Sequence, residues 1–232
     1  MSLPYFVGEH STPRPRTASD GLSVADCWQN LMQECHNPED REFFAALPED
    51  SPHRLLIHKL FIHTPHLSKL CFQYPRFLRQ IIELGFYDCA TQWHQSLPAF
   101  TEFTDDKPLM AIIRQHKSQG ALLIALADIA GEWPLEQVTH ELTLLAERTL
   151  QLCLNYLWHK MEIGGHIKPT SKPCEGLIVL GMGKLGGYEL NYSSDIDLVL
   201  LYDHEKVEYT GRQSLQHCLN RFSQDLVRLM QE

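Results

Sequence analysis

Two short apolar runs separated by a glycine-rich segment constrain the fold of this chain most. Residues 176–181 form an apolar run bounded by glycines. The run is too short for a helix and predicts a buried strand. Asp195 to Tyr202 first alternates and then becomes apolar, which predicts a second strand. Only residues 188–194 separate Gly187 from Asp195, whereas a parallel crossover with its helix needs at least about 10–12 residues. The strands are therefore expected to be antiparallel or joined by a tight turn.

The sequence before residue 168 has a helical pattern. Ser23 is a suitable N-cap, and Pro38 suits the first position of a second helix. Between Arg54 and Gly85, apolar residues recur every three or four positions, and Pro65 and Pro75 divide this stretch into short helices. Further helices are predicted over residues 104–131, Leu135 to Ile163 and Arg212 to Met230.

These elements predict an α+β chain. An all-helical N-terminal region precedes the start of a polymerase-β-like nucleotidyltransferase palm, with the order strand, turn, strand, helix. The predicted divisions are a flexible tail at 1–20, a helical region at 21–167, a linker at 168–175 and a partial nucleotidyltransferase domain at 176–232.

Composition excludes several broad classes. The chain has 232 residues, of which 44% are hydrophobic and 21% charged, as in ordinary globular proteins. A net charge of −9 argues against nonspecific nucleic-acid binding, which needs a basic surface. No apolar run approaches the roughly 20 residues of a membrane span, and residues 1–16 have no secretory-signal pattern. The seven cysteines include no CxxC pair, so we expect reduced thiols in a cytoplasmic protein.

Residues 181–197 allow three interpretations. Gly181, Gly183 and Gly186 spell the GxGxxG of dinucleotide-binding proteins, but the connection to the next strand is too short for that fold. A P-loop needs Ser or Thr after Gly-Lys, and Lys184 is followed by Leu185.

The third interpretation is a nucleotidyltransferase site. Asp195 and Asp197 are two residues apart on a predicted strand, so both side chains point to one face. Two neighbouring carboxylates repel each other unless a cation bridges them, and hard oxygen ligands beside phosphates favour Mg²⁺ or Mn²⁺. Backbone N–H groups of a glycine turn bind phosphate oxygens. The competing interpretation is a pair of aspartates that only caps a surface strand, because isolated DxD pairs are common.

The complete string GMGKLGGYELNYSSDIDL, residues 181–198, resembles the signature of the glutamine-synthetase adenylyltransferase (adenylyl-removing) family. The resemblance implies that Asp195 and Asp197 are catalytic and ligate the metals. It also implies that Gly183 and Lys184 hold phosphate and that Ser194 bonds a phosphate oxygen. By the same resemblance, Gly186 and Gly187 permit the close turn.

The family further implies a bifunctional enzyme that regulates nitrogen assimilation. Its N-terminal half removes AMP from a glutamine synthetase tyrosine by phosphorolysis. ATP or ADP and phosphate are the implied substrates, with glutamine synthetase and a PII signal protein as partners, and with no nucleic acid or membrane involved. The family's third carboxylate, in a D-x-R-L-R-P strand, does not occur in this sequence. We therefore expect an N-terminal portion that ends within the nucleotidyltransferase domain. The alternatives are a non-catalytic module that docks to glutamine synthetase and a nucleotidyltransferase of other specificity, such as a uridylyltransferase of a signal protein.

Overall fold

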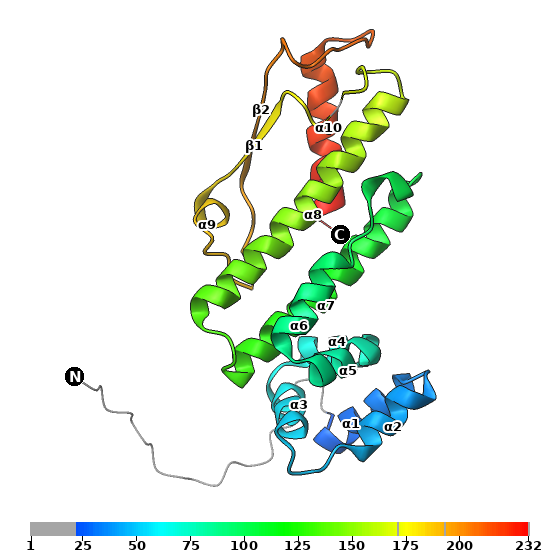
Figure 1. Ribbon diagram of the computed structural model, residues 1–232, viewed down its shortest axis with the longest axis vertical. Helices are drawn as coiled ribbons and strands as arrows, with labels where there is room; N and C mark the ends of the chain where they lie inside the picture. Colours follow the sequence, from blue (N-terminus) through cyan, green and yellow to red (C-terminus); the bar gives the residue numbers. More distant parts are fainter. Residues whose placement is uncertain (1–21, 171, 193, 232) are drawn as a thin grey trace, which may run out of the picture. The chain divides into compact units, whose positions relative to one another are not determined.

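The computed structural model describes residues 22–170, 172–192 and 194–231 (Figure 1). The predicted tail at 1–20 therefore lies outside the described residues. The chain forms two compact units that divide between Arg76 and Phe77. The predicted division at residues 168–175 remains a prediction.

The described part of the first unit, residues 22–76, contains four complete short helices whose starts follow from the sequence. They are α1 (Val24–Glu34), α2 (Pro38–Ala46), α3 (Pro52–His63) and α4 (Pro65–Gln73). Ser23 caps α1, since its Oγ accepts from the Asp26 N–H at 3.1 Å while the Asp26 carboxylate accepts from the Ser23 N–H at 2.8 Å. The prolines at the starts of α2 and α4 confirm the predicted helix boundaries.

The second unit contains the longer helices. They are α5 (Pro75–Leu84), α6 (Phe86–Gln95), the 3₁₀ turn η1 (Phe100–Glu102), α7 (Asp106–Ala130) and α8 (Leu135–Ile163). The first two residues of α5 belong to the first unit, because the boundary lies before Phe77. Helix α7 ends at Gly131, which has a left-handed φ of +72° and donates its N–H to the last turn. Helices α7 and α8 pack together as a hairpin (Figure 1). The bounds of α8 match the prediction, whereas α6 was not predicted.

The sheet consists of β1 (Leu177–Gly181) and β2 (Leu198–Tyr202), joined by α9 (Gly183–Gly186) and a loop. The strands are antiparallel, with Leu177 opposite Tyr202 and Gly181 opposite Leu198, which confirms the predicted direction. The second strand was predicted from Asp195 but begins at Leu198. Because β1 ends opposite Leu198, the residues before it have no strand to pair with.

The two faces of the sheet have different surroundings. Leu177, Val179, Leu198 and Leu200 pack against the core, beside α8 and α10 (Leu215–Met230; Figure 1). The outer face carries large apolar side chains that are 37–49% exposed: Ile178, Leu180, Val199 and Leu201. The core under the inner face includes Leu109, Ile113, Leu150, Cys153, Leu157, Trp158, Phe222, Leu226 and Leu229. This arrangement of helices with a small antiparallel sheet confirms the α+β class.

Two further predictions concern membranes and cysteines. Among the described residues, no helix is long and apolar enough to cross a membrane. All seven cysteines lie in the described part of the chain and carry free thiols.

Candidate active site

The glycine turn after β1 folds back closely on the strand. Gly183 has a left-handed φ of +55° and begins α9. A Cβ atom on Gly186 would lie 2.4 Å from the carbonyl oxygen of Gly181, so only glycine fits there without a shift. A Cβ atom on Gly187 would meet nothing closer than 3.5 Å, the distance to the Gly183 oxygen. The predicted need for a close turn therefore applies to Gly186 and not to Gly187.

Asp195 and Asp197 occupy one face of the segment that leads into β2. Both are exposed while Ile196 between them is half-buried, and the same alternation continues in β2 as far as Leu201. The N–H of Met182 donates to the carbonyl oxygen of Asp197 at 2.9 Å, which places the start of the glycine turn beside the second aspartate. Within the described residues, neither carboxylate has an ion pair or a side-chain hydrogen bond. The structure thus brings the start of the turn beside the backbone of Asp197, two residues from Asp195.

Ser194, for which the resemblance implies a phosphate contact, is engaged within its own loop. Its Oγ accepts from the N–H of Asn191 at 3.1 Å and donates to the Asn191 side-chain oxygen. These bonds close a short turn just before Asp195. In this arrangement Ser194 supports the loop, and its contact with phosphate stays a prediction.

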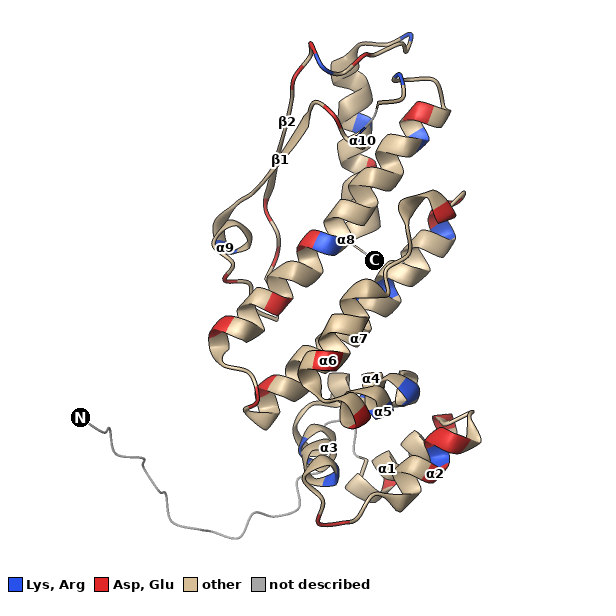
Figure 2. Ribbon diagram, in the orientation of Figure 1, with Lys and Arg blue, Asp and Glu red and all other residues tan. Residues whose placement is uncertain are grey.

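The local charge is negative. Lys184 is the single Lys or Arg between Gly176 and Tyr202, whereas Glu189, Asp195 and Asp197 are acidic. Figure 2 shows acidic residues on the segment between α9 and β2 and on α8 beside it. An anionic phosphate would be repelled here unless a cation offset this charge.

The two carboxylates fit a divalent cation in their chemistry. They supply hard oxygen ligands and are not neutralised by a neighbouring side chain. Nowhere among the described residues do three or more His, Cys, Asp or Glu side chains gather as a possible metal site. Asp203 and Asp225 do not join them, because Asp203 pairs with Lys206 at 3.7 Å and Asp225 with Arg228 at 3.3 Å.

Several cavities of the second unit lie outside the aspartate face; the largest described, of about 730 Å³, lies between α8, α10 and the segment around Tyr209. Another, of about 560 Å³, lies behind the glycine turn, between Gly181, Gly186 and Tyr188 and the α8 residues Glu147 and Arg148.

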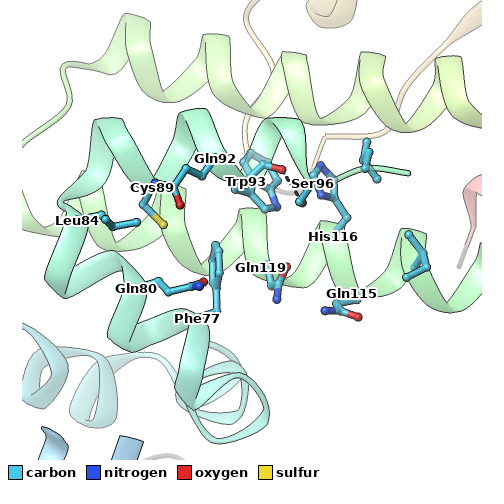
Figure 3. A pocket seen from close by; sticks show the side chains of 12 residues that line it. Phe77, Gln80, Leu84, Cys89, Gln92, Trp93, Ser96, Gln115, His116 and Gln119 are labelled. Carbon is cyan, nitrogen blue, oxygen red and sulfur yellow. Dashed lines mark hydrogen bonds between the residues drawn. The ribbon is translucent and has the colours of Figure 1, made fainter. Parts of the chain in front are cut away.

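A further cavity, of about 340 Å³, lies between α5, α6 and α7 (Figure 3). No charged side chain lines it. Burial, with the neighbouring charges of His94 and Arg148, lowers the pKa of its His116 to about 4. It contains none of the predicted site residues.

A glycine turn lies between antiparallel strands, and two exposed carboxylates lead into the second, which is the local arrangement that the sequence predicted for a nucleotidyltransferase site. A family model described as glutamate-ammonia ligase adenylyltransferase matches residues 56–232, and the chain belongs to this family.

Similar proteins are named as adenylyltransferases as well. The chain is 45% identical over 220 residues to the bifunctional glutamine synthetase adenylyltransferase/adenylyl-removing enzyme of Rhodopseudomonas palustris strain TIE-1, and 33% identical over 219 residues to that of strain CGA009. Each match covers 92% of this chain and 22% of the relative. A relative from Bradyrhizobium sp. strain BTAi1 is 43% identical over 133 residues, which are 55% of this chain and 13% of the relative. The chain thus spans about a fifth of the length of the two relatives that match most of it.

Two tyrosines near the site were not predicted from the sequence to have a role. Tyr188 has a left-handed φ of +58° and donates its hydroxyl to Glu147 Oε1 at 3.0 Å. Tyr192 donates its hydroxyl to Asp128 Oδ2 at 2.9 Å. Both partners are far upstream in the sequence, so no local pattern points to these contacts.

Proposed function

We propose that this chain carries nucleotidyl-transfer residues of a bifunctional glutamine synthetase adenylyltransferase/adenylyl-removing enzyme. The proposed reaction is the phosphorolytic removal of AMP from a glutamine synthetase tyrosine. The observation that supports it most is the exposed, unneutralised pair Asp195 and Asp197 beside the start of the glycine turn. The printed names of the relatives supply the reaction and its protein substrate.

The proposed reaction forms one phosphorus–oxygen bond and breaks another. An oxygen of inorganic phosphate attacks the phosphorus of the tyrosyl-AMP group, and the bond from that phosphorus to the tyrosine oxygen breaks. The products are ADP and a free tyrosine hydroxyl, whose proton comes from the attacking phosphate.

In this proposal, Asp195 and Asp197 hold Mg²⁺ or Mn²⁺. A divalent cation held there would supply positive charge that offsets the negative charge of the phosphates. Lys184 attracts phosphate oxygens by its charge, and the backbone N–H groups at Gly183 and Lys184 orient them. The resemblance also implies a PII signal protein as a partner and the cytoplasm as the location.

The test is ADP formation from AMP-modified glutamine synthetase with phosphate and Mg²⁺. Because the family's third carboxylate is absent from this sequence, the test also asks whether this chain alone is active. Where ADP forms, Asp195→Asn and Asp197→Asn should reduce its rate at least about a hundredfold, as for lost electrostatic stabilisation. Asp50→Asn is a matched control because Asp50 is an exposed aspartate of the first unit. Lys184→Ala is compared with Lys59→Ala in the same way.

A second measurement separates the alternatives. ADP binding is titrated in the presence of Mn²⁺, with the wild-type chain and with Asp195→Asn. Binding that needs Asp195 without turnover would indicate a nucleotide site that lacks the third carboxylate, whereas the absence of both would favour the docking module. If neither turnover nor Asp195-dependent binding is observed, the proposed function is wrong. Preferential binding of UTP would indicate the other specificity.

A further inference from the structure

Tyr188 holds an unusual backbone position directly after the glycine turn. The Glu189 N–H donates to the Lys184 oxygen at 2.8 Å, and the Tyr188 N–H donates to the Leu185 oxygen at 3.3 Å. These two bonds end α9 in a Schellman motif, with Tyr188 at the left-handed position that glycine usually occupies. A residue with a Cβ atom is disfavoured in this conformation, and such residues cluster at functional sites.

The side chain of Tyr188 is attached to α8. Its hydroxyl donates to Glu147 Oε1 at 3.0 Å, and its ring stacks on His140 with centroids 5.6 Å apart and planes inclined by 21°. Both partners are on α8, so the end of the turn is fixed to that helix.

A second tyrosine attaches the same loop to α7. The Tyr192 hydroxyl donates to Asp128 Oδ2 at 2.9 Å, near the end of α7. Between the two tyrosines, Leu190 is buried and anchors the loop independently of either hydroxyl. Loss of one tyrosine hydroxyl should therefore leave the loop folded.

The loop between these anchors and β2 leads directly to the aspartates. Asn191 and Ser194 close a turn that includes Tyr192, and Asp195 follows immediately. Among the described residues, neither carboxylate has a side-chain hydrogen bond or an ion pair, so the position of the pair depends on the backbone on either side. The Met182 to Asp197 hydrogen bond fixes the strand side, and the two tyrosines fix the loop side.

We infer that Tyr188 and Tyr192 are positioning residues. They hold the loop on the α7–α8 hairpin so that Asp195 and Asp197 lie in place for the metal and its phosphate ligand. This inference rests on the proposed function, because it assigns a role at the same site.

The test compares hydroxyl deletions. Tyr188→Phe and Tyr192→Phe each keep the ring and remove one hydrogen bond. The control is Tyr202→Phe, because the Tyr202 hydroxyl also donates to a side chain, Gln216 Oε1, at 3.2 Å but lies at the far end of β2. We measure the Mn²⁺ concentration for half-maximal ADP binding, together with the midpoint of thermal unfolding.

We expect each loop variant to raise the required Mn²⁺ concentration about fivefold, the effect of one ordinary hydrogen bond. The control should change it less than about twofold. The midpoints of thermal unfolding of the three variants should agree. If the loop tyrosines had only a structural role, their variants would instead unfold at lower temperature than the control. A shift in metal requirement equal to that of the control would overturn the inference and leave the proposed function intact.

A rescue experiment tests the Tyr192 contact itself. Asp128→Asn keeps an oxygen that accepts the hydrogen bond and should bind Mn²⁺ like the wild-type chain, whereas Asp128→Ala should match Tyr192→Phe. Combining Asp128→Ala with Tyr192→Phe should add nothing further, since both remove one interaction. Additive effects would contradict the inference. If ADP binding by the wild-type chain does not depend on Asp195, the proposed function fails and this inference fails with it.

Discussion

Arg228 Nη2 lies 2.6 Å from Asp106 Oδ2, although the two residues are 122 positions apart in the sequence. Asp106 also accepts hydrogen bonds from the Tyr156 hydroxyl at 2.7 Å and from Lys160 Nζ at 2.8 Å. One carboxylate at the start of α7 thus joins α8 and α10. Because α10 packs beside the sheet, this cluster links the helical hairpin to the strands that carry the candidate site.

Replacing Asp106 with asparagine should destabilise the second unit. The variant keeps one acceptor but loses the charge that pairs with Lys160 and Arg228. Because these partners are half exposed, we expect a decrease of about 1–2 kcal/mol in the free energy of unfolding. Urea unfolding measures this change. Asp225→Asn is the matched control, since Asp225 is more exposed and contacts the same Arg228 at 3.3 Å; its effect should stay below about 0.5 kcal/mol.

The same cluster predicts a loss of stability in acid. Partial burial raises the pKa of Asp106, but hydrogen bonds from Lys160, Tyr156 and Arg228 outweigh it and hold the pKa well below the ordinary 3.8. The unfolded chain therefore binds the proton more readily, and stability rises with pH in this range. The contribution is complete above about pH 5 and is lost as the pH falls through 3.8 towards the folded pKa.

Unfolding free energies of the wild-type chain and Asp106→Asn between pH 7 and pH 3.5 check this prediction. The difference between them should be constant above about pH 5 and shrink below it. His116, whose pKa is lowered to about 4, also responds to acid, but it is present in both proteins and cancels in the difference. A difference that does not change with pH would contradict the prediction.

Alanine at Gly186 should disrupt the candidate site, whereas alanine at Gly187 should not. The added methyl group at Gly186 would lie 2.4 Å from the Gly181 oxygen and must displace the turn, but at Gly187 its nearest neighbour is 3.5 Å away. We expect Gly186→Ala to weaken Mn²⁺-dependent ADP binding at least about tenfold, since small displacements at reacting groups have large effects. Gly187→Ala should stay within about twofold of the wild-type chain. Equal effects of the two variants would contradict this account of the turn.

Gly120→Ala should destabilise the chain, against the usual trend for helices. Alanine in place of glycine inside a helix normally stabilises by about 0.5–1 kcal/mol. Here the new methyl group would lie 2.3 Å from Cζ2 of Trp93, and overpacking of a core costs about 1–3 kcal/mol. We expect a net loss of about 1–2 kcal/mol by urea unfolding. Ser118→Ala, in the same helix, should be neutral or slightly stabilising.

Much of the fold follows from local sequence signals. Pro38, Pro65 and Pro75 begin helices because a proline ring suits the first helical turn, and Gly131 ends α7 because it adopts a left-handed φ. The short connection between the strands correctly excluded a parallel crossover. Helix α6 was not predicted, although the sequence contains a signal for it. Cys89, Ala90 and Trp93 recur at helical spacing, and all three are buried.

The candidate site was predicted only in part. The association of the glycine turn with the two aspartates could be predicted, because all of them lie within one short segment of the sequence. It could not predict that Ser194 is bonded to Asn191 or that Tyr188 and Tyr192 contact Glu147 and Asp128, because these depend on tertiary packing. The start of β2 was placed too early because the end of β1, and not the pattern of β2, limits the pairing.

The two loop tyrosines also give the molecule an optical property. The hydrogen bond to Glu147 raises the pKa of Tyr188, and burial together with the hydrogen bond to Asp128 raises that of Tyr192. Each phenol must release its shared proton to become a phenolate, which absorbs ultraviolet light at longer wavelength. Because the chain has eight tyrosines, the signal of the loop is the difference in alkaline absorbance between the wild-type chain and Tyr188→Phe or Tyr192→Phe. That difference reports, without an added label, when the loop detaches from the hairpin.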